Sequence, residues 1–134
     1  MVTTDDQRKE LLEQARTIAV VGLSPDESRA SNRVARYLID AGYTIIPVNP
    51  LHDRILGITS AASLADVTQP VDIVDIFMRS EHLLPVVEQA IQLRPKAIWL
   101  QLGIVNDEAK RLVEAAGIGF LQDACIKIEH QRLL

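Results

Sequence analysis

The sequence predicts an α/β protein with a mainly parallel sheet of five or six strands between two layers of helices. Short apolar runs rich in β-branched residues alternate along the chain with amphipathic stretches of helical period. The apolar runs lack polar alternation, which is typical of parallel strands that are covered by helices on both faces. Right-handed crossovers between such strands build a doubly wound sheet. The expected fold is therefore a Rossmann-like three-layer sandwich.

Length and charge narrow the class of protein. At 134 residues the chain is expected to form a single domain, residues 1–134, with a core of its own. The 14 Lys and Arg residues against 18 Asp and Glu residues give a net charge of −4. This balance argues against nucleic-acid or anionic-membrane partners, although it permits a local basic pocket. The single cysteine suits a reducing compartment, and with no apparent signal peptide or membrane-spanning run we expect a cytoplasmic location.

The first part of the chain is predicted to contain two strands and two helices. A capping-box pattern at Thr4 begins a short leading helix. The apolar run 17–22 stops at a glycine and predicts the first strand, and the stripe over 31–41 predicts the next helix. Residues 44–48 predict the second strand. Because Pro47 has no N–H for a ladder hydrogen bond, this strand is expected at an edge, a bulge or a strand end.

The second part continues the alternation after an irregular stretch over 52–70, in which residues 55–57 are expected to be extended. Helices are predicted over 80–93 and from an Asn106 cap to Gly117. Further strands are predicted over 72–77, 97–100 and 118–121. The alternating Lys127, Glu129 and His130 are interpreted as a half-exposed strand with a solvated or packing face, in preference to an acid–base pair.

The loops after the predicted strands define a candidate site. In a doubly wound sheet the ligand binds outside the carboxyl ends of the strands, where the strand order reverses. These loops contain small hydroxyl residues, two glycines and four arginines, Arg29, Arg33, Arg54 and Arg79. Arginine forms bidentate hydrogen bonds to phosphate, so the loops favour an anionic, phosphate-bearing ligand.

The loop after the first strand matches no standard phosphate motif. A dinucleotide fingerprint that starts at Gly22 needs glycine where the chain has Ser24 and Glu27, and the nucleoside-triphosphate loop is absent. The loop instead leads into a helix N-terminus, where Ser24, Ser31 and Arg33 can add donors to the backbone N–H groups. An ordinary connection with Ser31 as the helix cap explains the loop equally well.

No catalytic or metal-binding pattern is found in the sequence. The histidines His52, His82 and His130 lie far apart and form no ligand-spaced pair. Ser24 lacks the closing glycine of a nucleophile elbow, and Trp99 on the fourth strand is expected in the core.

Specific sequence blocks extend over nearly the whole chain, from about residue 14 to residue 130. The most distinctive are Trp-Leu-Gln-Leu-Gly at 99–103 and Cys-Ile-Lys-Ile-Glu-His at 125–130. The others lie at 19–25, 31–38, 42–50, 71–77 and 79–82. In these blocks the chain resembles the small stand-alone CoA-binding proteins, which share a domain with the α subunit of succinyl-CoA synthetase.

The resemblance implies that coenzyme A or an acyl-CoA binds at the carboxyl ends of the strands. Residues expected beside the pyrophosphate and the pantetheine arm are Gly22, Leu23, Ser24 and Pro25. Residues expected to bind phosphate oxygens are Arg29, Ser31, Asn32 and Arg33. The nucleoside is expected to border Val48, Asn49 and Pro50, and the residues expected to close over the ligand are Phe77 and Arg79.

The chain departs from the family pattern at three positions. Leu51 stands where the resemblance leads us to expect lysine, Asp75 where we expect asparagine, and Ala124 where we expect arginine. A buried Asp75 would need hydrogen-bond partners. Cys125 follows the fifth strand, so a mixed disulfide with the CoA thiol is one hypothesis, and a small buried side chain is the preferred alternative.

The sequence therefore predicts a CoA-binding protein without catalysis of its own. One domain leaves no second domain for the phosphorylated histidine that the synthetase α subunit needs. One alternative is a subunit of a CoA-ligase-like enzyme that needs a separate ATP-grasp partner. Another is a CoA-responsive sensor that docks on a protein. A homodimer or an unidentified protein partner is compatible with either, and another nucleotide such as NAD stays an open ligand.

Overall fold

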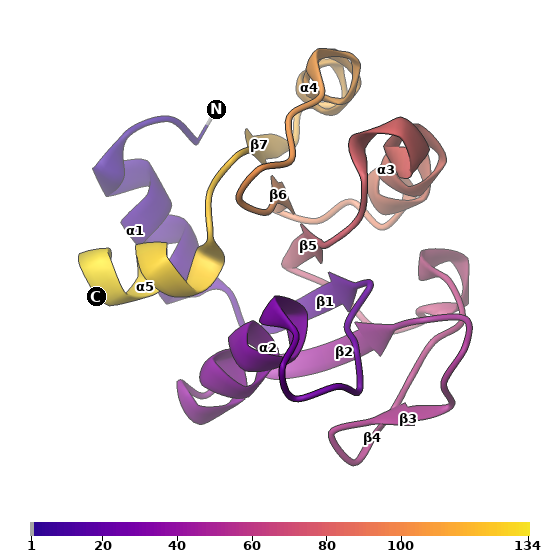
Figure 1. Ribbon diagram of the computed structural model, residues 1–134. Helices are drawn as coiled ribbons and strands as arrows, with labels where there is room; N and C mark the ends of the chain where they lie inside the picture. Colours follow the sequence, from indigo (N-terminus) through magenta and orange to yellow (C-terminus); the bar gives the residue numbers. More distant parts are fainter. Residues whose placement is uncertain (1) are drawn as a thin grey trace.

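The computed structural model describes residues 2–134 and contains a five-stranded parallel sheet between two helical layers (Figure 1). The strands of this sheet are β1 (Thr17–Val21), β2 (Thr44–Val48), β5 (Ile73–Ile76), β6 (Ala97–Leu100) and β7 (Gly119–Leu121). Their order is β2-β1-β5-β6-β7, and every neighbouring pair is parallel. The predicted Rossmann-like class is confirmed. The strand order reverses between β1 and β5, and this point fixes where a ligand site is expected.

Five α-helices form the outer layers of the sandwich. They are α1 (Asp5–Gln14), α2 (Ala30–Asp40), α3 (Leu83–Gln92), α4 (Asp107–Ala115) and α5 (Ile126–Leu133). Helices α3 and α4 cover one face of the sheet, and α1, α2 and α5 cover the other (Figure 1). Short 3₁₀ turns, η1 (Leu64–Asp66) and η2 (Ser80–His82), precede β5 and α3. None of the helices within residues 2–134 is long and apolar enough to span a bilayer.

Helix ends follow the predicted caps. The hydroxyl of Thr4 accepts a hydrogen bond from the N–H of Gln7 at 3.2 Å, and the Gln7 amide oxygen accepts one from the N–H of Thr4 at 3.1 Å. The Asn106 side-chain oxygen accepts a hydrogen bond from the N–H of Ala109 at 2.9 Å. Each cap satisfies backbone donors that have no partner inside the helix.

The sheet residues alternate between two apolar cores, one under each helical layer. Trp99 is fully buried between the sheet and the layer of α1, α2 and α5, which confirms its predicted core position. Its indole N–H donates a hydrogen bond to the carbonyl of Ala124 at 2.8 Å. Asp75 lies between Val20 and Trp99 in the strand register and is fully buried as well.

The edge position of the second strand is also confirmed. β2 is the outermost strand of the sheet, and Pro47 lies on its outer side, where its missing N–H breaks no bond with β1. The carbonyl of Pro47 accepts a hydrogen bond from the N–H of Ala61 at 2.9 Å, and the N–H of Asn49 donates to the carbonyl of Ala61 at 2.9 Å.

Two predicted elements need correction. Residues 55–57 are not one extended piece: β3 (Arg54–Ile55) and β4 (Ile58–Thr59) form a hairpin, and positive φ angles at Leu56 and Gly57 close its turn. The half-exposed strand expected around residues 127–130 is wrong, because these residues belong to helix α5. The cap that starts α5 comes from elsewhere in the fold, since the side-chain oxygen of Gln101 accepts a hydrogen bond from the N–H of Ile126 at 3.1 Å.

Candidate functional site

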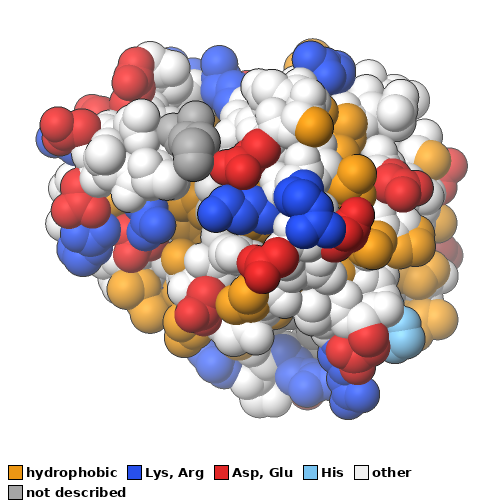
Figure 2. Space-filling model, turned by 90° about the horizontal axis from the view of Figure 1, so that it is seen from above, with side chains coloured by type: hydrophobic (Ala, Val, Ile, Leu, Met, Phe, Trp, Pro, Cys, Tyr) orange, Lys and Arg blue, Asp and Glu red, His pale blue; other side chains and the backbone are white. Residues whose placement is uncertain are grey.

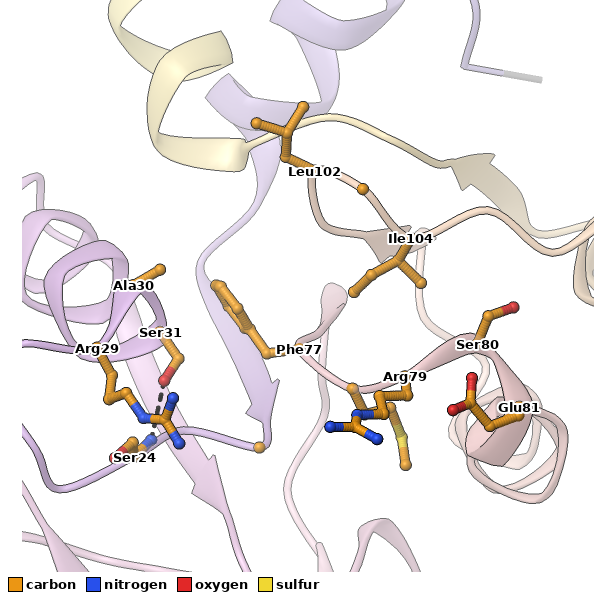
Figure 3. A pocket seen from close by; sticks show the side chains of 13 residues that line it. Ser24, Arg29, Ala30, Ser31, Phe77, Arg79, Ser80, Glu81, Leu102 and Ile104 are labelled. Carbon is orange, nitrogen blue, oxygen red and sulfur yellow. Dashed lines mark hydrogen bonds between the residues drawn. The ribbon is translucent and has the colours of Figure 1, made fainter.

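A cavity of about 700 Å³ opens at the point where the strand order reverses (Figure 3). Its walls come from the loop after β1, the start of α2, the loop after β5 and the loop after β6. The lining residues that the sequence singled out are Gly22, Ser24, Arg29, Ser31, Phe77 and Arg79. The structure thus brings together residues from two distant loops, as the doubly wound topology requires.

Polar side chains of α2 fix the loop after β1. The hydroxyl of Ser31 accepts a hydrogen bond from the N–H of Ser24 at 3.0 Å (Figure 3). The side-chain amide of Asn32 donates to the carbonyl of Ser24 at 2.9 Å, while its oxygen accepts from the guanidinium of Arg36 at 2.8 Å. Because α2 begins at Ala30, Ser31 is inside the helix and is not its cap. Asn32 is fully buried and does not line this cavity, so its side chain positions the loop.

Gly22 is needed for contact with the protein's own backbone. It has a φ of +80°, and a Cβ atom at this position would lie 2.2 Å from the carbonyl oxygen of Phe77. The ends of β1 and β5 can therefore approach only because residue 22 has no side chain. This close approach places the Phe77 ring next to the loop after β1, inside the cavity (Figure 3).

Two arginines supply the positive charge of the cavity. The guanidinium of Arg29 points in from one side and that of Arg79 from the other (Figure 3). Neither guanidinium forms a hydrogen bond or ion pair with another residue of the described part of the chain. The N-terminus of α2, which begins at Ala30, adds a partial positive charge. Glu81 is the acidic residue in the lining. The arrangement is suited to binding an anion with several oxygens.

A carboxylate shapes the same loop from outside the cavity. Asp26 accepts hydrogen bonds from the backbone N–H of Ser28 at 2.9 Å and from its hydroxyl at 2.7 Å. These bonds, the backbone one first, lower the pKa of the Asp26 carboxyl below its ordinary value. The N–H of Arg29 donates to the carbonyl of Asp26 at 3.0 Å, so this turn leads directly into α2.

The residues predicted beside a nucleoside lie outside the cavity. Val48 is buried and Pro50 is exposed. The side-chain amide of Asn49 donates to the carbonyl of Leu23 at 3.0 Å, and its oxygen accepts from the N–H of Leu51 at 2.8 Å. Asn49 therefore joins the end of β2 to the loop after β1. Of the other predicted residues in that loop, Leu23 is fully buried and Pro25 is exposed outside the cavity.

A second cavity, of about 530 Å³, lies between α2 and α5 and adjoins the first. The two cavities have four lining residues in common, Ala30, Phe77, Leu102 and Ile104. Arg33 lines this second cavity, and its guanidinium donates a hydrogen bond to the carbonyl of Ser28.

Sequence reasoning selected few of the second cavity's residues. Its other lining residues are Val34, Gln101, Cys125, Lys127, Ile128 and Gln131. Gln101 and Leu102 directly follow the fourth strand, so the rule that sites lie at strand ends selects them, although the resemblance assigns neither to the ligand. The residues of α5 carry no such signal, because only Ile126 of this helix is buried and the helix has no apolar stripe.

Charge is mixed elsewhere on the surface. On the face shown in Figure 2, acidic and basic side chains are interspersed. Within residues 2–134 no group of three or more His, Cys, Asp or Glu side chains is arranged to hold a metal ion. The cationic cavity is therefore the feature of the described chain that points to a ligand.

Comparison with known proteins agrees with this geometry. The sequence model of a family described as "CoA binding domain" matches residues 16–131. An uncharacterized Bacillus subtilis protein, YneT, is 43% identical over 122 residues, which are 91% of this chain and 90% of that protein. A solved Thermus thermophilus structure, cell-free ID.343, is 39% identical with a TM-score of 0.95, and the match covers 98% of this chain and 100% of that chain.

A more distant structural relative is part of a larger enzyme. A dinucleotide-forming acetyl-coenzyme A synthetase from Ca. Korarchaeum cryptofilum is 23% identical with a TM-score of 0.74. The match covers 86% of this chain and 28% of that chain, and it shows a shared fold.

Proposed function

Because this chain belongs to the family of CoA-binding domain proteins, we propose that it binds coenzyme A or an acyl-CoA at the carboxyl ends of β1 and β5. The observation that supports this proposal best is the pair of arginines, Arg29 and Arg79, which enter one cavity from opposite sides with no partner in residues 2–134. CoA carries a pyrophosphate and a 3′-phosphate. Guanidinium groups without partners, next to a helix N-terminus, are well placed to receive such groups.

The proposed arrangement assigns different parts of the ligand to different walls. The phosphates lie near Arg29, Arg79 and the N-terminus of α2, with Ser24 as a further donor. The pantetheine arm passes the ring of Phe77. Residues 48–50 lie outside the cavity, and Asn49 holds them against the loop after β1, so the nucleoside borders them where the ligand extends beyond the cavity.

We propose binding without catalysis by this chain alone. None of the histidines lines either cavity within residues 2–134, and no nucleophile is hydrogen-bonded to a base there. Acyl transfer or ligation by this fold would need groups from a second chain. A mixture of this protein with an ATP-grasp subunit therefore serves as the test for the alternative, a ligase subunit.

The proposal is tested by isothermal titration of the protein with CoA. Each charge-assisted hydrogen bond contributes roughly 1.5–3 kcal/mol, so Arg29→Ala and Arg79→Ala should each weaken binding about tenfold or more. Affinity should also fall as salt increases. Arg111→Ala is the matched control, because Arg111 is exposed on α4 and paired with Glu108. A flat titration at millimolar CoA would overturn the proposal.

A further inference from the structure

The two cavities at the sheet edge are positioned to hold different parts of one ligand. They share Phe77, Leu102 and Ile104 as a common apolar wall, together with Ala30 at the start of α2. The first cavity carries the arginines without partners. A ligand whose phosphates lie in the first cavity therefore reaches the second by crossing this wall.

The second cavity presents apolar side chains to solvent. Leu102 is 65% exposed and Ile128 is 52% exposed, and both line this cavity. Ala30, Val34, Phe77 and Ile104 form the rest of its apolar lining. Single exposed apolar residues are ordinary on protein surfaces, but several around one hollow indicate a place where apolar groups bind.

The polar groups of the second cavity are largely engaged by the protein itself. The Gln101 side-chain oxygen accepts a hydrogen bond from the N–H of Ile126, and Arg33 donates to the carbonyl of Ser28. The ammonium of Lys127 lies 5.6 Å from the centre of the Tyr37 ring, within the range of a cation–π interaction. An apolar ligand segment leaves these interactions intact.

We infer that the second cavity holds the acyl group of a CoA thioester, so that the preferred ligand is an acyl-CoA with an aliphatic chain. This inference rests on the proposed function and makes it more specific. The phosphates stay in the first cavity, the pantetheine arm crosses the wall at Phe77, and the acyl chain covers Leu102 and Ile128.

The test is a titration series with CoA, acetyl-CoA, butyryl-CoA and hexanoyl-CoA at one salt concentration. Burial of a methylene contributes about 0.8 kcal/mol, so each added methylene should tighten binding roughly threefold to fourfold until the cavity is full. Succinyl-CoA matches butyryl-CoA in chain length but ends in a carboxylate, so tighter binding of succinyl-CoA would show that Arg33 and Lys127 bind an anionic acyl end and would overturn the inference. Equal affinities across the series, or weaker binding of longer chains, would overturn the inference.

Two variants separate the cavity from the rest of the surface. Ile128→Gln should flatten the dependence on chain length while CoA itself binds as before, because Ile128 lines the second cavity alone. Val105→Gln is the matched control: Val105 is 49% exposed and lines neither cavity, so the chain-length dependence should persist. If Val105→Gln flattens the series as strongly as Ile128→Gln, the assignment to the second cavity is wrong.

Failure of the inference differs from failure of the proposed function. If CoA binds but chain length has no effect, only the inference is overturned. If neither CoA nor any thioester binds, the proposed function is overturned, and the inference with it. A dimer in native mass spectrometry that Ile128→Gln dissociates, together with no chain-length effect, would assign this face to an interface between copies and also overturn the inference.

Discussion

The buried carboxyl of Asp75 makes a specific prediction about stability and pH. Asp75 is 0% exposed, and neither of its carboxyl oxygens has a hydrogen-bond partner among residues 2–134. Desolvation raises the pKa of this carboxyl well above its ordinary value. In the unfolded chain the same group ionises near pH 3.9. Between the two pKa values the folded state therefore holds a proton that the unfolded state releases.

The sign of the effect follows from this difference in bound protons. The contribution of Asp75 to stability is greatest below the unfolded pKa and falls as pH rises toward the folded pKa, by about 1.4 kcal/mol per pH unit. Asp75→Asn keeps the shape of the side chain and removes its ionisation. The variant should match the wild type near pH 4 and gain about 1.4 kcal/mol relative to it for each further pH unit until the pH reaches the folded pKa.

The measurement is urea unfolding of both proteins at pH steps from 4.5 to 8 at constant ionic strength. Subtracting one curve from the other removes the contributions of the titratable groups that both proteins have. One of these is His130, whose pKa is lowered by burial. Asp40→Asn makes the same chemical change at an exposed position and controls for net charge. If the Asp75→Asn and wild-type curves stay parallel over this range, the carboxyl is not kept neutral by burial and the reasoning is refuted.

Substitutions at three further positions test a close backbone contact, a helix cap and a buried hydrogen bond. Gly22→Ala should lower the free energy of unfolding by more than about 2 kcal/mol, because φ is positive and Cβ would overlap the Phe77 carbonyl; an unchanged urea midpoint would contradict this. Asn106→Ala should cost about 1 kcal/mol and Asn106→Ser much less, as measured by thermal unfolding, and equal losses would argue against capping. Trp99→Phe should cost about 1–3 kcal/mol in urea unfolding by removing the donor to the Ala124 carbonyl, and a smaller loss would show that this bond contributes little.

The strands were predictable because their signal is local. The buried strands are almost wholly apolar runs, such as Ala97–Leu100, and the edge position of β2 is one of the three positions that Pro47 allows. Helix α5 had no such signal. Of its eight residues only Ile126 is buried, so it shows no apolar stripe. Contacts from distant residues hold it in place, including the Gln101 cap.

The site was predictable in part for the same reason. The rule that ligands bind at strand ends selected Arg29 and Arg79, the family resemblance added Phe77, and the three residues share one cavity in the structure. The sequence did not reveal that Asn32 would turn inward to hold Ser24, because its role depends on how the loop folds onto α2. It also could not reveal the second cavity, whose far wall is α5.

The outer side of β2 limits how copies of this protein can associate. The backbone N–H and C=O groups of residues 45, 47 and 49 point away from β1. Strand groups alternate in direction, and those of residues 44 and 48 form hydrogen bonds on the β1 side. Ala61 already occupies the carbonyl of Pro47 and the N–H of Asn49, and Pro47 has no N–H to offer. Within β2, Ile45 is the remaining residue whose backbone groups point outward, and one residue cannot form a ladder between two chains. Pairing of β2 with a strand of another copy would therefore require Ala61 to be displaced.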